Sequence, residues 1–438
     1  MTAGSAVPGL VSGSLGNGDL ADIDRRLAAT DELLTKEYPG DDGSRQPVHT
    51  VYVPADRFTP DLPAQWGAEA ADAVAAFGDT VALATEVGLG ELAASIAPLV
   101  DAKLRTEPIE DLRLDFEDGY GDRGDDAEDA DAVVAAERVA AAVAGGTAPP
   151  FVGIRFKSFE APTRRRGLRT LDLFVTTLAE SGELPDGLVL TLPKVTTVAQ
   201  VEAMADVCER LERKLGLADG RLRFEVQMET PQLIIAADGT VPVATLLHSA
   251  SKSSAGGRVS ALHYGTYDYS ASLQIAAAYQ SMEHSAADFA KHVMQVAAAE
   301  TGVRLSDGST NVIPVGDSEH VMDAWRLHAR LVRRSLEHGF FQGWDLDAAQ
   351  LPTRFLATYA FYREGLDAAT RRLHNYLHGT DAAIMDEPAT ARALARYVVR
   401  GLECGAVTSA EVEDAAGATP AELTRLAHPK LASIEETS

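Results

Sequence analysis

The stretch Arg223–Thr230, RFEVQMET, decides the predicted fold of this chain. Apolar and polar side chains alternate along it, which is the two-residue period of a β-strand. Glu229 stands at the end of that strand, before a Thr-Pro turn, and a second short apolar run at Val259–Tyr264 leads to Asp268. Two carboxylates at the carboxyl ends of successive strands are what a barrel enzyme needs to hold a hard divalent cation.

Strand-like and helix-like segments alternate in both directions from this stretch. Short runs rich in β-branched and aromatic residues are expected to be strands; they are His49–Pro54, Leu112–Phe116, Phe151–Phe156, Leu188–Leu192, Phe224–Met228, Val259–Tyr264, Asn311–Val315 and Gly339–Trp344. Helical spacing predicts helices at Asp22–Tyr38, Ala68–Leu104 (one or two), Ala127–Ala144, Leu168–Glu180, Val198–Leu215, Pro242–Ser251, 272–301 and Glu319–Glu337. Eight alternations of this kind predict a (β/α)₈ TIM barrel of the α/β class.

The predicted organisation has three parts. Residues 1–45 form an N-terminal segment that is mobile in part, residues 46–351 form the barrel, and residues 352–438 form a C-terminal helical extension. The extension is helical from about Pro352 onward, with breaks near Gly379–Pro388 and Gly417–Pro420. A length of 438 residues exceeds an ordinary domain, but α/β barrels often do.

Composition narrows the class of partner. The formal net charge of −26, from 65 acidic and 39 basic residues, repels nucleic acid phosphates and anionic lipid surfaces. We therefore expect no nucleic acid and no membrane as partners. An anionic substrate stays compatible, because local arginines and a metal can reverse the sign inside a pocket.

The cellular location is predicted to be the cytoplasm. Cys208 and Cys404, the only two cysteines, cannot build a disulfide framework or a thiolate zinc site. The first residues lack the basic start and the apolar core of a secretion signal, and no run is long enough to span a bilayer.

Polar side chains close most of the expected strands. Because the carboxyl ends of parallel strands meet on one face of a barrel, we expect these side chains to collect there. They are Asp56, Arg57, Asp115, Glu117, Asp118, Arg155, Lys157, Lys194, Glu229, Asp268 and either Asp345 or Asp347. Carboxylates mixed with Arg and Lys suit a divalent metal and an anionic oxo-acid. A metal there could polarise a 2-oxo group and stabilise an enolate, which indicates carbon–carbon bond chemistry next to a carbonyl.

Each of these residues also has a structural interpretation. The acidic run at Asp115–Asp126 is typical of a solvated surface or a loose cation site. Arg155 could pair with a neighbouring acid, and Lys194 could extend from a strand end into water. Glu229 and Asp268 precede helical stretches and could be helix caps.

The histidines are not predicted to be ligands. His263 lies inside an apolar strand and is expected to be a core residue with a satisfied ring. Surface positions are expected for the histidines on helix-like segments, which are His248, His284, His292, His320 and His328. The basic run Arg164–Gly167 is expected to cover a loop, with binding of a phosphate or a CoA tail as the alternative.

Six motifs, read together, resemble the HpcH/HpaI aldolase and citrate-lyase β-subunit family of the pyruvate/phosphoenolpyruvate-binding barrel superfamily. They occur in the family's order between about residues 50 and 351. They are VYVPADR at Val51–Arg57, DFEDGY at Asp115–Tyr120, GIRF at Gly153–Phe156, PKV at Pro193–Val195, MET at Met228–Thr230 and YGTYD at Tyr264–Asp268. The sequence around RFEVQMET and the aromatic GTYDY also resemble malate synthases.

The resemblance implies roles for these residues. Glu229 and Asp268 would bind Mg²⁺, with Mn²⁺ as an alternative, and Arg155 would contact the substrate carboxylate or enolate oxygen. Glu117 and Asp118 would order the waters on the metal. The remaining residues predicted to bind substrate are Lys194, Asp56 and Arg57. The resemblance also implies a homo-oligomer.

Two departures from the family pattern stand out. The interval between Glu229 and Asp268 is longer than in the family, which implies an insertion around Ala237–Gly257. The family's His-Pro near the end of the barrel is replaced by Asp347-Ala348, so the residue for any role tied to that histidine is missing.

Three functions remain open from the sequence. The leading hypothesis is a Mg²⁺-dependent carbon–carbon lyase or aldolase that acts on a 2-oxo acid or a related acyl-CoA through a metal-stabilised enolate. The second is a malate-synthase-like Claisen condensation of acetyl-CoA with a 2-oxo acid. The third is an inactive barrel that serves as a binding or regulatory subunit, although clustered carboxylates are costly to keep without a function.

Overall fold

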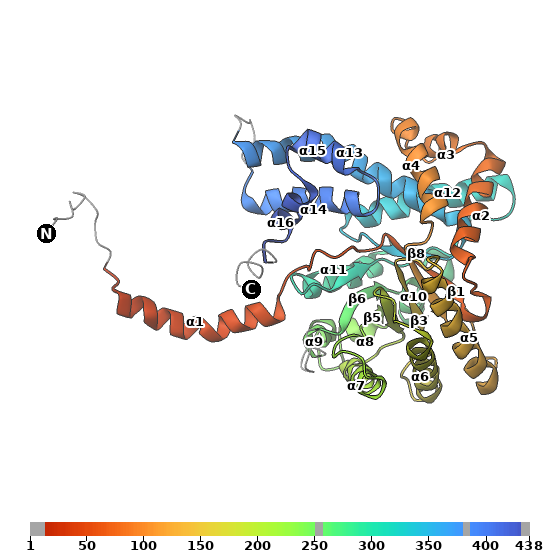
Figure 1. The fold of residues 1–438 in the computed structure, drawn as a ribbon, viewed down its shortest axis with the longest axis horizontal. Coiled ribbons are helices and arrows are strands. Elements are labelled where there is room, and N and C mark those ends of the chain that lie inside the picture. The colour runs from red at the N-terminus through yellow and green to blue at the C-terminus, as the bar shows by residue number, and fades with distance from the viewer. Residues whose placement is uncertain (1–13, 250–256, 380–385, 431–438) are drawn as a thin grey trace.

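Eight parallel strands form a barrel at the centre of the molecule (Figure 1). The computed structural model describes residues 14–249, 257–379 and 386–430. The strands are β1 (His49–Pro54), β2 (Asp111–Asp115), β3 (Phe151–Arg155), β4 (Leu188–Leu192), β5 (Phe224–Met228), β6 (Val259–Tyr264), β7 (Arg304–Ser306) and β8 (Gly343–Asp345). They pair in the order β7-β6-β5-β4-β3-β2-β1-β8, and a bridge between Ser306 and Gln342 closes the ring.

Helices surround the barrel and continue beyond it. They are α1 (Asn17–Glu37), α2 (Leu62–Phe77), α3 (Thr80–Glu86), α4 (Ala93–Thr106), α5 (Asp125–Ala144), α6 (Arg164–Ser181), α7 (Val198–Leu215), α8 (Pro231–Ile234), α9 (Pro242–Ser249), α10 (Thr266–Ser272), α11 (Ser285–Ala298), α12 (Ser318–Glu337), α13 (Leu351–His378), α14 (Pro388–Glu403), α15 (Ser409–Ala416) and α16 (Pro420–Ala427). Short 3₁₀ turns are η1 (Ala55–Arg57), η3 (Ala277–Tyr279) and η4 (Ala348–Gln350). The predicted TIM barrel with a C-terminal helical extension is confirmed.

The alternation along each strand sorts side chains between the two sides of the barrel wall. In β2, Leu112 and Leu114 are fully buried in the apolar core, whereas Arg113 reaches across the barrel interior to β4 and β5. In β5, Phe224 and Val226 join that core, and Glu225 meets Arg113 inside the barrel. In β2 and β5, every second side chain is therefore polar and points into the barrel, and a polar residue stands where each strand ends at the carboxyl face.

Several predicted elements differ in the structure. The seventh strand is Arg304–Ser306, so the prediction of a strand at Asn311–Val315 is wrong; that segment contains Pro314, which cannot donate to a ladder, and Val315 is half exposed. Residues 272–301 form no continuous helix, because the chain leaves α10 at Ser272 and restarts α11 at Ser285.

Two further predictions are corrected. The run Arg164–Gly167 forms the first turn of α6 and does not cover a loop; Gly167 is required because a Cβ there would lie 2.1 Å from the Lys157 carbonyl oxygen. His328 is buried on α12, contrary to the prediction of a surface position, because α13 packs over α12.

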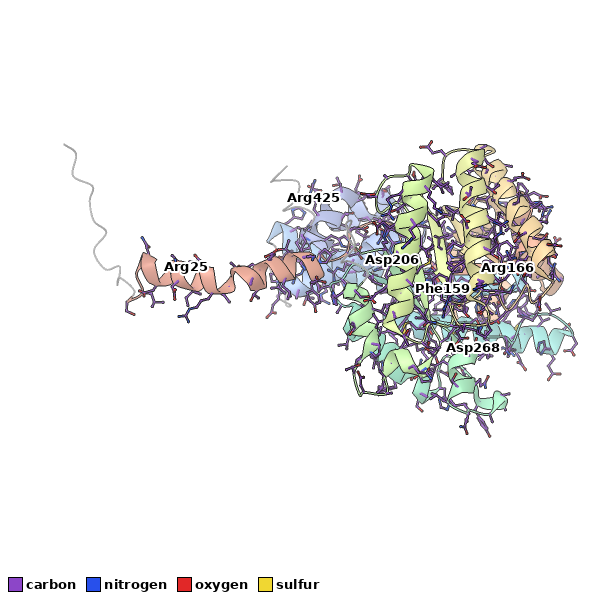
Figure 2. All side chains as sticks on the ribbon, turned by 90° about the horizontal axis from the view of Figure 1, so that it is seen from below. Arg25, Phe159, Arg166, Asp206, Asp268 and Arg425 are labelled. Atoms are coloured by element: carbon purple, nitrogen blue, oxygen red, sulfur yellow. The ribbon has the colours of Figure 1, made fainter. Side chains whose placement is uncertain are left out.

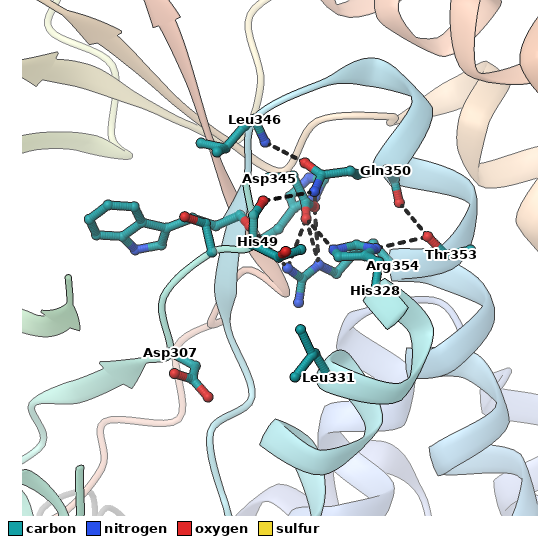
Figure 3. A network of polar contacts seen from close by, with 12 residues as sticks. His49, Asp307, His328, Leu331, Asp345, Leu346, Gln350, Thr353 and Arg354 are labelled. Atoms are coloured by element: carbon teal, nitrogen blue, oxygen red, sulfur yellow. Dashed lines mark hydrogen bonds and ion pairs between the residues drawn. The ribbon is translucent and has the colours of Figure 1, made fainter. Parts of the chain in front are cut away.

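A buried polar network joins the barrel to the C-terminal extension (Figure 3). Asp345 at the end of β8 accepts hydrogen bonds from Arg354 of α13, lies 3.1 Å from Nε2 of His328 of α12, and contacts Nδ1 of His49 at 2.7 Å. Nε2 of His49 accepts from the Glu110 amide, so the ring proton is assigned to Nδ1. Asp345 therefore faces the helices and not the carboxyl face of the barrel.

Candidate functional site

A cluster of charged side chains lies at the carboxyl face of the barrel, around the ammonium group of Lys194. Nζ lies 2.6 Å from Glu117 Oε1, 2.8 Å from Asp118 Oδ2 and 3.4 Å from Asp268 Oδ2. The Lys194 amide donates to Glu229 Oε1 at 2.7 Å. Lys194 thus connects residues that follow β2, β5 and β6, and it adopts a left-handed backbone conformation with φ of 49°. A non-glycine residue in that region is uncommon, and strained residues of this kind cluster at active sites and ligand-binding sites.

Glu229 is the most deeply buried carboxylate of the cluster, with 2% of its surface exposed. It follows β5 directly and packs against Gly265 at the end of β6. A Cβ at Gly265 would lie 2.5 Å from Glu229 Cβ and 2.6 Å from its Oε2, so only glycine leaves room for the carboxylate. Burial raises the pKa of Glu229 to about 8, and the charges of Glu117 and Asp268 add to the effect.

Arg155 is fixed at the end of β3 by a bidentate ion pair. Its Nε and Nη2 each donate to Asp115 at 2.7 Å, and its Nη1 lies 3.3 Å from Glu117 Oε2. The guanidinium also lies over the ring of Tyr52, 4.8 Å from its centroid. Two donors to one carboxylate and an aromatic face fix the plane of the group, which leaves Nη1 directed towards the cluster.

The acidic turn after β2 is held by two local devices. Asp115 accepts from the amides of Glu117 and Gly119, and a Cβ at Gly119 would lie 2.6 Å from the Asp115 carboxylate. Lys157 donates to the carbonyl oxygens of Phe116 and Gly121 and pairs with Glu128 of α5. These contacts hold the turn in place, and the turn brings Asp118 close to Lys194.

A pocket of about 340 Å³ opens beside the cluster. Its lining includes the charged residues Glu117, Asp118 and Lys194. It also includes Ser158 and Thr163, whose hydroxyls lie 2.8 Å apart. Nothing in the strand pattern pointed to these two hydroxyls, because they lie after β3 in the connection to α6. They supply neutral hydrogen-bonding groups next to a charged site, a combination suited to a small polar ligand.

Asp56 and Arg57, also predicted to bind substrate, are not brought to the cluster. Asp56 pairs with Arg123 at 2.6 Å, and Arg57 is exposed on η1. Asp347 caps η4 by accepting from the Ala349 amide. Of the residues predicted for the site, the structure therefore groups six around the same point, and these are Glu117, Asp118, Arg155, Lys194, Glu229 and Asp268.

The barrel interior below the cluster carries a second polar network, which the sequence analysis did not identify. Arg113 donates to Asp111, to Thr191 at 2.9 Å and to Glu225 at 2.9 Å, and His263 Nε2 lies 3.0 Å from Glu225 Oε2. His263 is buried in the core as expected, but its Nδ1 has no hydrogen-bond partner among the described residues, so the expectation of a satisfied ring is wrong. The signal was present in the alternation of β2 and β5, which places Arg113 and Glu225 on the inner side of the wall.

The donor set fits a hard divalent cation. Two cations, Arg155 and Lys194, face five carboxylates, which are those of Asp115, Glu117, Asp118, Glu229 and Asp268. Burial raises the pKa of Glu229, and the charges of Glu117 and Asp268 raise it further. Among the described residues, no group of three or more His, Cys, Asp or Glu side chains has the arrangement of a protein-only metal cage. Mg²⁺ needs no such cage, because one or two carboxylates suffice when waters and substrate oxygens complete the octahedron.

Comparison with known proteins identifies the family. Residues 27–431 match the family described as a domain of unknown function, DUF6986. The chain belongs to this family. No curated protein matches the sequence. In the described part of this DUF6986 member, no helix combines the length and apolar character needed to cross a membrane.

Solved structures extend the comparison to the fold. A citrate lyase of Burkholderia xenovorans LB400 is similar with a TM-score of 0.55 and 19% identity, over 84% of this chain and 96% of that chain. A malate synthase of Haloferax volcanii at 3 mM glyoxylate has a TM-score of 0.48 and 13% identity, over 87% and 97%. A citrate lyase β subunit of M. tuberculosis, complexed with oxaloacetate and magnesium, has a TM-score of 0.40 and 16% identity, over 71% and 96%. The first similarity confirms the expected resemblance at the level of the fold.

Proposed function

We propose that this protein is a Mg²⁺-dependent carbon–carbon lyase acting on a 2-oxo acid or a related acyl-CoA at the carboxyl face of its barrel. The observation that carries the proposal is the meeting of Glu229, Asp268 and Lys194 with the oriented guanidinium of Arg155 at one point. The residues that would hold the ion are Glu229 and Asp268, with Mn²⁺ as an alternative to Mg²⁺. When bound, the ion supplies a Lewis acid that polarises a carbonyl group.

Arg155 would bind the anionic part of the substrate. Its Nη1 is the guanidinium nitrogen that does not contact Asp115, and it points to the carboxylate of Glu117 at 3.3 Å. A substrate oxygen that gains negative charge as the carbon–carbon bond breaks would accept a hydrogen bond there. Because Asp115 holds the guanidinium in place beforehand, little reorganisation accompanies that charge.

Glu117 and Asp118 would orient water, and Lys194 would balance their charge. Glu117 is 7% exposed and Asp118 is more accessible, so the pair bridges the buried and open sides of the site. Lys194 reaches both of them and Asp268 from a backbone fixed by Glu229. The ammonium group therefore partly offsets the electrostatic repulsion between four neighbouring carboxylates, which are those of Glu117, Asp118, Glu229 and Asp268.

The proposal is tested by binding and by turnover with the full-length protein. Mg²⁺ or Mn²⁺ should raise the midpoint temperature of thermal unfolding of the native protein. It should do the same for Asp238→Asn, an exposed control in the connection from α8 to α9. The increase should be lost in Asp268→Asn, because that change removes one ligand while its half-exposed position preserves the fold. An undiminished Mg²⁺ effect in Asp268→Asn would contradict the assignment.

Turnover separates the chemical classes. Oxaloacetate, pyruvate and acyl-CoA esters, each with Mg²⁺, should reveal a lyase by loss of the 2-oxo acid or of the ester. Release of free thiol from acetyl-CoA only in the presence of glyoxylate would instead identify the malate-synthase-like condensation. Absence of turnover together with specific stabilisation by one of these compounds would identify a binding subunit.

A further inference from the structure

The N-terminal helix α1 carries an apolar face that none of the described residues covers. None of its residues is buried, and Figure 2 shows its side chains, Arg25 among them, extending away from the body of the protein. Large apolar side chains follow the heptad spacing of a packing face and are about half exposed; they are Leu20, Ile23, Leu27 and Leu34, with Leu33 at the edge. Half-exposed leucines repeated at this spacing indicate a missing contact.

The base of α1 is attached to the body of the protein by several contacts. Glu37 pairs with His248 of α9 at 2.7 Å, and the ring of Tyr38 packs against the same histidine. The amide of Gly40 donates to the Glu300 carbonyl oxygen at 2.8 Å. Contacts on both sides of the exit point hold the direction in which the helix leaves the body (Figure 1).

A groove of about 500 Å³ lies next to that exit point. Asp41, which lines it, is four residues beyond the end of α1. Its apolar part is built from β7, the segment before β8 and the C-terminal helices, with Leu305, Phe341, Phe361 and Tyr397 among the lining residues. It lies at the amino end of the strands, away from Glu229, because it borders the residues that precede β7 and β8.

Charge makes the helix and the groove complementary. The sequence of α1 contains six acidic residues and three basic ones. Arg304, Arg396 and Arg400 line the groove, and Arg396 uses only Nε, towards the Ala427 carbonyl oxygen, in the contacts of the described residues. The other charged residues of the groove are already paired: Asp41 with Arg400, Arg304 with Asp42, Glu300 with Lys430 and Glu337 with Arg333. The terminal nitrogens of Arg396 are therefore the positive groups that the groove offers to an acidic helix.

We infer that α1 packs into this groove of a second copy of the chain, and that the second copy returns the same contact. An acidic helix is a poor match for the phosphates of lipid or nucleic acid, whereas amphipathic helices that lie on membranes are rich in Lys and Arg. A protein groove with arginines therefore fits better. Each copy offers one helix and one groove side by side, which is the self-complementarity of a two-fold dimer.

The size of the contact agrees with a dimer. A helix of 21 residues is about 31 Å long and about 10 Å wide, so one packed face covers about 300 Å² on each partner. One such contact buries about 600 Å² in total, which is less than a specific interface needs. Two contacts bury about 1,200 Å², which reaches the lower end of the range for specific complexes.

The experiment measures the mass of the full-length protein in solution by light scattering over a series of concentrations. The native chain should be dimeric or a multiple of a dimer. Ile23→Glu with Leu27→Glu should give at least a tenfold weaker association, because two carboxylates would enter an apolar contact. Ala21→Glu with Ala28→Glu adds the same charges to exposed positions of α1 outside the apolar face, and it should leave the mass unchanged.

The groove is tested independently at Ala393, an exposed lining residue on α14. Ala393→Glu should weaken association as strongly as the change in α1, and Ala415→Glu, at an exposed position of α15, should not. Circular dichroism checks that each variant keeps its helices. A monomeric native chain overturns the inference. Association that survives Ala393→Glu but is lost on substitution in α1 overturns it as well, because the helices would then pair with each other.

Discussion

Glu229→Gln should make the metal-free protein more stable, and increasingly so as the pH rises. Glutamine keeps the shape of the side chain and an oxygen that accepts from the Lys194 amide. It removes the charge that burial, Glu117 and Asp268 make unfavourable. The perturbation therefore isolates the electrostatic cost that the folded protein carries at this position.

The magnitude follows from the pKa of Glu229, which burial and its acidic neighbours raise from 4.5 to about 8. Below pH 4.5 both the folded and the unfolded chain hold the proton, so this group adds no pH dependence. Between pH 4.5 and about 8 only the folded chain holds it, and the free energy of unfolding falls as the pH rises. At about 1.4 kcal/mol for each pH unit, the loss is roughly 3 kcal/mol at pH 7 and about 5 kcal/mol above pH 8.

The assay is urea unfolding in the presence of a chelator from pH 5 to pH 9, followed by tryptophan fluorescence. Trp344 reports on the barrel interior, because its ring lies 4.8 Å from that of Tyr52. The native protein and Glu229→Gln should unfold with similar free energies at pH 5 and diverge by several kcal/mol at pH 8. Glu69→Gln, an exposed change on α2, should follow the native protein throughout.

Addition of Mg²⁺ should reverse the order of stability at pH 8. The ionised Glu229 of the native protein would bind the ion and gain stability, whereas the glutamine variant would gain much less. Two curves that stay parallel from pH 5 to pH 9 would refute the electrostatic reasoning. A reversal absent at saturating Mg²⁺ and Mn²⁺ would refute the role of Glu229 as a ligand.

Two further predictions address the support of the site. Asp345→Asn should lower the free energy of unfolding by about 3–5 kcal/mol, because it leaves the buried Arg354 without its ion-pair partner. Urea unfolding measures this loss. The stabilisation by Mg²⁺ should stay unchanged, because Asp345 lies outside the carboxylate cluster around Lys194. Gly265→Ala should abolish that stabilisation in thermal unfolding, because the new Cβ would displace Glu229. Its backbone φ of −100° accepts alanine, so the fold should persist, and Gly18→Ala in open space is the matched control.

The sequence predicted the barrel because most of its strands carry a period of two between helices with a different period. It failed at β7, which has only three residues and pairs through Arg304, Leu305 and Ser306. A strand of three residues is too short to show alternation. The seventh strand was therefore predicted at Asn311–Val315, which is more apolar. Pairing with β6 decided the outcome, and pairing is a long-range property that local composition does not contain.

The site was predictable to the extent that strand ends are predictable. Arg155 ends β3, and Glu229 and Asp268 follow β5 and β6; the alternation located the bounds of these strands. Asp345 was predicted, as an alternative to Asp347, to lie at the carboxyl face of the barrel. That prediction is wrong because β8 is too short for the sequence to show which of its residues point into the barrel. Trp344 points into the barrel, and a shift of one residue sends Asp345 to the opposite side, towards His328.

Glu225 and Glu229 show what separates structural from functional charge in this barrel. Glu225 lies within β5 and Glu229 comes directly after it, on the same inner side of the barrel wall. Both side chains are almost completely buried. Burial alone would raise the pKa of Glu225, but its contacts with Arg113 and His263 lower that pKa overall. Four residues further on, burial raises the pKa of Glu229 to about 8, and the charges of Glu117 and Asp268 add to the rise. A fold gains nothing from an ionised carboxylate held in such a place, and a strongly perturbed pKa at the carboxyl face therefore favours a functional role for Glu229.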